Sequence, residues 1–131
     1  MFVFAKGRMK TVNLIRDKPN KFAGTITRSN KYNKNGERKG RAVYQVAKFG
    51  KRTNLWKLHH DNQGEIAHPA AFPRSLPEGH ILSWSNRGDL ILDPFGGSGT
   101  TGLVARQLER RWIMIEQNSE FFEHAKQRLI T

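Results

Sequence analysis

Residues 90–108, LILDPFGGSGTTGLVARQL, limit the possible folds of this chain more than any other stretch. The apolar residues 90–92 predict a buried strand, and the glycines after them predict a tight turn. Leu103, Val104 and Leu108 then fall on one side of a helix. A strand, a glycine turn and a helix in this order predict a βαβ unit, with parallel strands and a right-handed crossover.

The residues on either side predict the rest of this unit. The run WIMIE at 112–116 predicts the second strand, and Asn118 or Ser119 predicts the cap of a final helix. The apolar side of this helix consists of residues four apart, Phe121, Ala125 and Leu129. Upstream, Ser75 predicts the cap of another helix that tolerates Pro77 in its first turn. The predicted fold class is therefore α/β, in the order helix, strand, helix, strand, helix.

The positive charge of the chain lies in its first half. The net charge is +12. Residues 1–64 contain 16 Lys or Arg against three Asp or Glu, whereas residues 65–131 contain seven against eight. The aromatic residues interleaved with this charge are Phe22, Tyr32, Tyr44, Phe49 and Trp56. This composition favours nucleic acid as the partner of the first half, and a well-solvated basic surface is the alternative.

Secondary structure in the first half is predicted less sharply. Residues 2–7 predict a strand, and Phe2, Val3 and Phe4 make it apolar on both faces, as in the interior of a sheet. A short N-terminal strand of a small sheet fits these residues equally well. Residues 18–41 are polar, basic and rich in Asn and Gly, which predicts a loop with a turn at Asn35-Gly36. A short strand is predicted over residues 42–50.

Composition excludes several kinds of protein and site. The chain contains no cysteine, which excludes disulfides and thiolate metal sites. Its five histidines share no ligand spacing and have no carboxylate cluster beside them, so we predict no metal site. The chain has no apolar run long enough to cross a bilayer, and its N-terminus lacks the pattern of a signal peptide. We therefore expect a cytoplasmic protein that does not contact a membrane.

The glycine turn has features of a nucleotide-binding turn. Gly97, Gly99 and Gly102 satisfy G-x-G-x-x-G, and Glu116 follows at the end of the next strand, where an acid accepts the hydroxyls of a ribose. On its own this pattern indicates a dinucleotide. Three features disfavour that ligand. They are the Asp-Pro-Phe insertion before the glycines, the paired threonines at the mouth of the turn, and the lack of a second nucleotide-binding half in so short a chain.

S-Adenosylmethionine fits the turn better than a dinucleotide. Glu116 is placed to bind its ribose, and Asp93 lies where an acid favours the cationic methionyl arm. A P-loop is excluded because no lysine follows Gly99, so a triphosphate lacks its charge partner. A glycine turn that binds no ligand is the alternative.

Residues 68–129 resemble the C-terminal segment of prokaryotic and phage DNA amino-methyltransferases, which methylate adenine N6 or cytosine N4. The most specific part of the resemblance is DPFGGSGTT at 93–101, and HPAAFP at 68–73 is similar to the motif before the family's first strand. Glu116 matches the acid that binds the ribose. The resemblance implies S-adenosylmethionine as cofactor, bound by His68, Pro69, Phe72, Asp93, Phe95, Gly97, Ser98, Gly99, Thr100, Thr101 and Glu116.

The resemblance also implies an organisation for the chain. Residues 1–7 would form a strand of the methyltransferase sheet, residues 8–66 a basic target-recognition region, and residues 67–131 the S-adenosylmethionine-binding segment. The implied fold is a partial Rossmann-like sheet, a βαβ unit with flanking helices, beside a basic and loop-rich recognition lobe. Double-stranded DNA is the implied partner. The candidate DNA contacts are Lys10, Arg28, Lys31, Lys34, Arg38, Lys39 and Arg41.

Two departures from the family pattern bear on activity. The family's catalytic loop has the form Asp/Ser/Asn-Pro-Pro-aromatic and binds the amino group of a flipped-out base, but this chain contains no Pro-Pro pair. Met114 stands where the family commonly has glycine, and a methionine there would crowd the adenine side of the site. We therefore expect that the chain alone does not catalyse methyl transfer.

Three hypotheses remain open. The favoured one is the cofactor-binding and DNA-recognition part of a restriction–modification type methyltransferase, acting on adenine N6 rather than cytosine N4, with the catalytic loop on a companion chain. The alternative is a truncated, non-catalytic basic DNA-binding protein. A small dinucleotide-binding fragment is the third. Strand edges left without neighbours favour self-association, so a homodimer is also considered.

Overall fold

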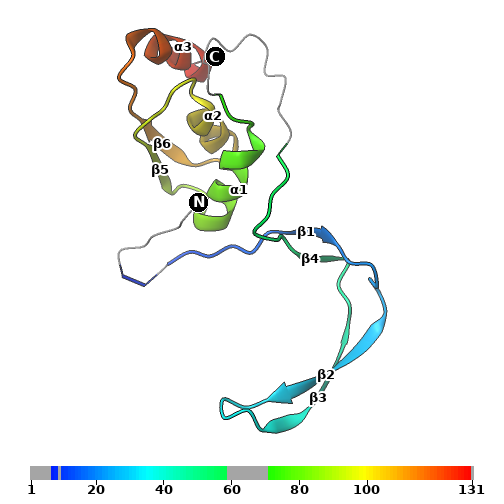
Figure 1. Cartoon of the computed structure of the whole chain (residues 1–131). Helices are drawn as coiled ribbons and strands as arrows, with labels where there is room; N and C mark the ends of the chain where they lie inside the picture. The colour runs from blue at the N-terminus through cyan, green and yellow to red at the C-terminus, as the bar shows by residue number, and fades with distance from the viewer. Residues whose placement is uncertain (1–6, 9, 59–70, 131) are drawn as a thin grey trace. The chain divides into compact units, whose positions relative to one another are not determined.

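The computed structural model describes residues 7–8, 10–58 and 71–130 of the chain (Figure 1). The chain divides into two compact units, which we call unit 1 (Met1–Asn13 and Trp56–Thr131) and unit 2 (Leu14–Leu55). Residues 2–6 of the strand predicted at residues 2–7 lie outside the described residues.

Unit 1 contains the predicted βαβ unit. Its elements are α1 (Ser75–Trp84), β5 (Leu90–Asp93), α2 (Thr100–Gln107), β6 (Arg111–Met114) and α3 (Ser119–Ile130). Strands β5 and β6 pair in parallel, from Leu90 opposite Arg111 to Asp93 opposite Met114. The predicted order of helix, strand, helix, strand and helix is confirmed, as is the α/β fold class. None of the helices among the described residues is long and apolar enough to span a lipid bilayer.

The core of unit 1 lies on one face of the two-stranded sheet. Ile81 of α1 packs with Val104 and Ala105 of α2, and all three are buried. Half-buried side chains of both strands, Ile91 and Trp112, pack against them. The opposite face carries Leu90, Leu92, Ile113 and Ile115, whose side chains are 50–61% exposed. The strand at 90–92 is thus buried on one face only, because the described helices pack on that face.

Of the two predicted helix caps, the one at α3 is confirmed and the one at α1 is wrong. Asn118 caps α3 as predicted, because its Oδ1 accepts the N–H groups of Glu120 at 2.9 Å and Phe121 at 3.2 Å. The prediction that Ser75 caps α1 is wrong. Ser75 is the first helical residue, and Arg74 occupies the cap position without a side-chain cap bond. The start of α1 is instead stabilised by a backbone hydrogen bond, in which the N–H of Leu76 donates to the carbonyl of Pro73 at 3.1 Å.

Residues 11–13 belong to unit 1 by their hydrogen bonds. The N–H of Asn13 donates to the carbonyl of Ser83 at 2.8 Å, and its side-chain amide donates to the carbonyls of Leu82 and Ser85, each at 3.0 Å. These bonds satisfy carbonyl groups at the C-terminal end of α1. The compact basic unit therefore begins at residue 14, whereas the recognition region was predicted to begin at residue 8.

Unit 2 consists of two antiparallel strand pairs. The pairs are β1 (Arg16–Pro19) with β4 (Phe49–Lys51), and β2 (Ile26–Tyr32) with β3 (Arg38–Gln45). Figure 1 shows β2 and β3 as a hairpin with its turn at the free end. The prediction of a loop over residues 18–41 is wrong. The strands form although they are polar, because cross-strand pairing satisfies their backbone groups without a buried face.

The predicted turn at Asn35-Gly36 is confirmed. It connects β2 to β3, and Gly36 has a φ of +81°, which glycine adopts without strain. The Oδ1 of Asn33 accepts the N–H groups of Asn35 at 3.0 Å and Glu37 at 2.8 Å, which stabilises the turn from inside.

Candidate functional site

The turn from β5 to α2 is held by its own backbone and by the end of β6. Oδ1 of Asp93 accepts the N–H of Phe95 at 3.0 Å, which begins the turn. The N–H of Gly96 donates to the carbonyl of Ile115 at 2.8 Å, and the N–H of Gly99 donates to the carbonyl of Gly96 at 2.9 Å. The predicted cofactor residues from Asp93 to Gly99 thus lie in a turn with a defined conformation.

Glycine is required in this turn for two different reasons. Gly97 and Gly99 have φ values of +51° and +84°, which side chains rarely adopt. Gly99 also lies against α3, since a Cβ there would be 3.1 Å from the Cβ of Ala125. At Gly96 a Cβ would be 2.6 Å from Cε of Met114, and one at Gly102 would collide with the sulfur of the same side chain. The close packing of α2, α3 and β6 around the turn therefore depends on these glycines.

The two acids of the site lie at the carboxyl ends of the neighbouring parallel strands β5 and β6. Asp93 is the last residue of β5 and pairs with Met114, and Glu116 follows two residues after Met114. Oε2 of Glu116 accepts the N–H of Gly97 at 2.7 Å, and Oε1 accepts the N–H of Asn118 at 2.9 Å. In open α/β sheets, ligands bind beyond the carboxyl ends of the strands. The backbone bonds hold the Glu116 carboxylate beside the glycine turn.

Ser98 and Thr100 have buried side chains that bond inside the protein. Their hydroxyl oxygens lie 3.2 Å apart, and their exposed fractions are 6% and 2%. Nη1 of Arg128 in α3 donates to the carbonyl of Ser98 at 2.9 Å and to Oγ1 of Thr100 at 3.3 Å. Burial, together with the nearby cation of Arg74, lowers the pKa of Arg128. These hydrogen bonds connect α3 to the glycine turn. The sequence motif did not predict a role for Arg128.

A pocket of about 370 Å³ brings together three residues that were predicted to bind cofactor, Phe72, Asp93 and Thr101. Its other walls come mainly from α1 and include His80. Burial lowers the pKa of His80, whose ring stacks on Trp56 with centroids 4.7 Å apart. The volume lies in the range of small-molecule pockets, and the lining combines apolar side chains with one carboxylate.

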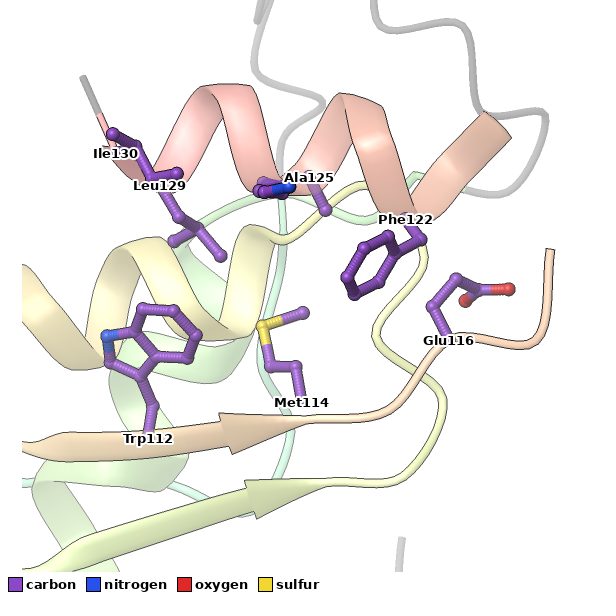
Figure 2. A pocket seen from close by; sticks show the side chains of 8 residues that line it. Trp112, Met114, Glu116, Phe122, Ala125, Leu129 and Ile130 are labelled. Carbon is purple, nitrogen blue, oxygen red and sulfur yellow. The ribbon is translucent and has the colours of Figure 1, made fainter. Parts of the chain in front are cut away.

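A second pocket, of about 300 Å³, lies between β6 and α3 (Figure 2). Figure 2 shows Met114 beneath α3, with Phe122 nearby and Glu116 beyond the end of the strand. The glycine turn also touches this side, because Met114 fills the space beside Gly96. Sequence reasoning missed Phe122, which lines this pocket although it is 46% exposed. Its neighbour Phe121, which the helical spacing placed on the inward side, is the more buried of the two.

The remaining predicted site residues are not gathered in either pocket. His68 and Pro69 lie outside the described residues. The ring of Phe95 is 85% exposed. Of the candidate DNA contacts, Lys10 belongs to unit 1. The other six lie on the hairpin of unit 2, namely Arg28, Lys31, Lys34, Arg38, Lys39 and Arg41. Among the residues that the structure describes, no three His, Asp or Glu gather as a metal site would require.

Comparison with known proteins identifies the family. The family model N6_N4_Mtase, described as DNA methylase, matches residues 1–127. The chain belongs to this DNA methylase family. It is 42% identical over 138 residues to the orphan methyltransferase M.BamHII of Bacillus amyloliquefaciens, a match that covers 98% of this chain and 52% of that protein. It is 44% identical over 80 residues to the type II methyltransferase M.HpaI of Haemophilus parainfluenzae, covering 59% of this chain and 26% of that protein.

A solved structure supports the fold of this DNA methylase chain. The M1.HpyAVI–SAM complex is similar with a TM-score of 0.52 and 39% sequence identity, covering 70% of this chain and 49% of that one. The resemblance to DNA amino-methyltransferases, inferred from the motif at 93–101, is confirmed. The chain spans about half the length of M.BamHII and of M1.HpyAVI, and less of M.HpaI.

Proposed function

We propose that this chain is the cofactor-binding and DNA-recognition part of an S-adenosylmethionine-dependent DNA methyltransferase that acts on an exocyclic amino group. The observation that carries the proposal is the pair of acids beside the glycine turn. Asp93 ends β5, Glu116 follows two residues after the end of the neighbouring parallel strand β6, and Glu116 is bonded to the turn through Gly97. DNA as partner implies a place in the cytoplasm of a prokaryotic cell.

The residues present fit S-adenosylmethionine. Glu116 would accept the ribose hydroxyls, because its carboxylate is already fixed at the end of β6. The pocket lined by Phe72, Asp93 and Thr101 offers an apolar wall and one negative charge, which suits the cationic methionyl arm. When bound, the cofactor supplies an activated methyl group. Ser98 and Thr100 would act through their backbone, since their side chains bond inside the protein.

Met114 shapes the adenine side of this proposed site. Its side chain fills the space beside Gly96 and Gly102 and lines the pocket under α3. In the family pattern a glycine commonly stands here, so this chain would bind the adenine against a methionine. A flexible thioether adapts its shape to a neighbouring ring more readily than a branched side chain does.

We further propose that these residues alone do not transfer methyl groups. The sequence contains no Pro-Pro pair, and hence no loop of the kind that binds a flipped-out base. A separate segment would supply this loop. The apolar face of β5 and β6, with Leu92 61% and Ile115 55% exposed, supports such a companion, because it is not covered by the described helices. A homodimer that covers this face is the competing arrangement.

Complementation tests this part of the proposal. The chain would be mixed with a segment that carries an Asp/Asn-Pro-Pro-aromatic loop, taken from a methyltransferase relative. We expect no labelled methyl on a duplex library with either part alone and clear incorporation with both. Mass spectrometry of the nucleosides then tests adenine N6, which we propose as the target, against cytosine N4.

The matched control is the same companion with its loop aromatic replaced by alanine, which should fold but not catalyse. Methyl transfer by the chain alone would contradict its proposed dependence on a companion. No transfer by a mixture that forms a stable complex would contradict the complementation itself. Light scattering distinguishes the mixed complex from a homodimer.

The affinity for duplex DNA should depend strongly on salt. If the six basic residues of the hairpin each displace one counterion from the DNA, whether they lie against a phosphate or in a groove, the affinity falls about 10³-fold between 50 and 200 mM salt. Fluorescence anisotropy with a labelled duplex measures this slope. Replacing Lys34 in the turn with alanine should lower the slope by about one. An affinity that does not change with salt would contradict DNA binding by unit 2.

A non-catalytic DNA-binding protein is the second candidate. The observation in its favour is that unit 2 holds 12 Lys or Arg against two Asp or Glu, and contains none of the residues predicted to bind cofactor. Calorimetry with S-adenosylmethionine separates the two candidates. Heat of binding supports the methyltransferase part, and its absence in a folded chain that binds DNA supports the second candidate.

A further inference from the structure

The β2–β3 hairpin sorts its side chains onto two different faces. Because side chains alternate along a strand, cross-strand partners share a face. On one face the pairs are Ile26 with Gln45, Arg28 with Val43, and Asn30 with Arg41. On the other face they are Thr27 with Tyr44, Ser29 with Ala42, and Lys31 with Gly40. The second face is therefore made mostly of small side chains.

A bulge near the turn adds another arginine to the first face. Lys31 pairs with Gly40 but Tyr32 pairs with Arg38, so Lys39 is an extra residue in β3. Tyr32 lies on the face of Asn30, and the two side chains are joined by a hydrogen bond of 3.4 Å. Arg38, opposite Tyr32, joins them. We call the face formed by Arg28, Asn30, Tyr32, Arg38 and Arg41 the arginine face.

The arginine face is not neutralised within the part of the chain that the structure describes. Unit 2 contains two acids, Asp17 and Glu37. Asp17 forms an ion pair with Arg52, whose hydrogen bond lowers the pKa of that carboxyl. Glu37 accepts a hydrogen bond from the side chain of Asn33 at 2.6 Å. The three arginines of the hairpin form no ion pair with a described residue.

Within unit 2, the hairpin is also not covered by other elements. Val43 of β3 is 64% exposed and Ile26 of β2 is 74% exposed. A two-stranded hairpin alone is only marginally stable in water. A partner that covers the arginine face would add the contacts that the hairpin lacks within the chain.

We propose that the hairpin enters the major groove of duplex DNA with its arginine face toward the bases. A two-stranded ribbon fits this groove, whereas the minor groove is too narrow for it. Arginine recognises guanine through O6 and N7, and asparagine recognises adenine through N6 and N7. Arg28 and Arg41 would thus recognise guanine, and Asn30 would recognise adenine. Lys31, Lys34 and Lys39, which lie off this face, would contact phosphates and carry no base preference.

This inference rests on the DNA-binding part of the proposed function. Selection of duplexes from a randomised library by the full chain gives its preferred sequence. Arg41→Lys keeps the charge but loses the planar fork that binds a guanine edge. We expect this variant to bind bulk DNA about as well as the wild type, while discrimination at one base pair falls about 10- to 100-fold. Asn30→Ala should relax an adjacent position.

The matched control is Lys31→Ala, which removes a charge from the opposite face of the same hairpin. It should weaken binding to all sequences equally and lower the salt slope by about one. Replacing the preferred guanine with 7-deazaguanine, which lacks N7, should weaken the wild type more than Arg41→Lys, because lysine binds the guanine edge as a point charge without the planar fork. Circular dichroism checks that each variant keeps its strands.

The outcomes separate the two proposals. Three outcomes would overturn the arginine face as the recognition surface. They are binding without any base preference, an equal loss of specificity in Lys31→Ala and Arg41→Lys, and no effect of 7-deazaguanine. Each of these leaves DNA binding by unit 2 intact. A wild-type chain that binds no duplex at low salt would instead overturn the DNA-binding part of the proposed function.

Discussion

Replacing Glu116 with alanine should weaken binding of S-adenosylmethionine about 100-fold or more. The carboxylate is fixed between the N–H groups of Gly97 and Asn118, at the end of β6 where a ribose would lie. Hydrogen bonds to a charged acceptor contribute about 1.5–3 kcal/mol each, and two hydroxyls would lose them together. Isothermal titration calorimetry of the wild type and the variant measures the change directly.

Two further variants show whether the loss comes from the ligand or from the turn. Glu120→Ala removes the same charge from an exposed position of α3 and should leave the affinity unchanged. Glu116→Gln keeps an acceptor oxygen for one of the two backbone N–H groups and loses the charged acceptor, and circular dichroism checks that the fold is kept. Unchanged affinity in Glu116→Ala would contradict the placement of the ribose at this acid.

Replacing Gly99 with alanine should destabilise unit 1 by about 2–5 kcal/mol. Its φ of +84° costs an alanine about 1–2 kcal/mol. A Cβ would also lie 3.1 Å from that of Ala125, so α3 or the turn must shift, which adds about 1–3 kcal/mol. Denaturant unfolding measures the loss of stability, and cofactor affinity should fall with it.

Gly88 provides the matched control for this prediction. It has a nearly equal φ of +81°, but a Cβ there would meet no atom within 4 Å. Gly88→Ala should therefore show only the cost of the backbone conformation, and it should keep cofactor affinity. The difference in unfolding free energy between Gly99→Ala and Gly88→Ala measures how much the packing of α3 on the turn contributes to stability. Equal destabilisation would mean that this packing contributes nothing to stability.

The βαβ unit could be predicted because its signals are local. The apolar run predicts β5, the glycines predict the turn, and the spacing of Ala125 and Leu129 predicts α3. Each of these patterns spans only a few residues. The hairpin was missed for the opposite reason. Strands β2 and β3 are mostly polar and bury little, so hydrophobic periodicity has no signal for β2. The strand predicted over residues 42–50 covers only the last four residues of β3. Only the Asn35-Gly36 turn revealed that the chain reverses there.

The cofactor residues stay a prediction, and the structure shows how their side chains lie. The motif named Phe72, Asp93 and Thr101 as cofactor residues, and one pocket brings them together. The same motif also named Ser98 and Thr100, but it could not show that their side chains are buried against Arg128. Arg128 is 30 positions from Ser98 and 28 positions from Thr100 in the sequence. These contacts form only because α3 packs against the turn.

Sequence patterns alone were therefore enough for the family, the α/β class, the glycine turn, the acids Asp93 and Glu116, and the basic character of the first half. These properties follow from residue type and from spacing within one element or turn. Folding decided which side chains of the motif face a pocket, how Glu116 is held, and that three arginines share one face of a hairpin. Those properties arise from strand register and helix packing, which bring distant residues together and leave no mark in local spacing.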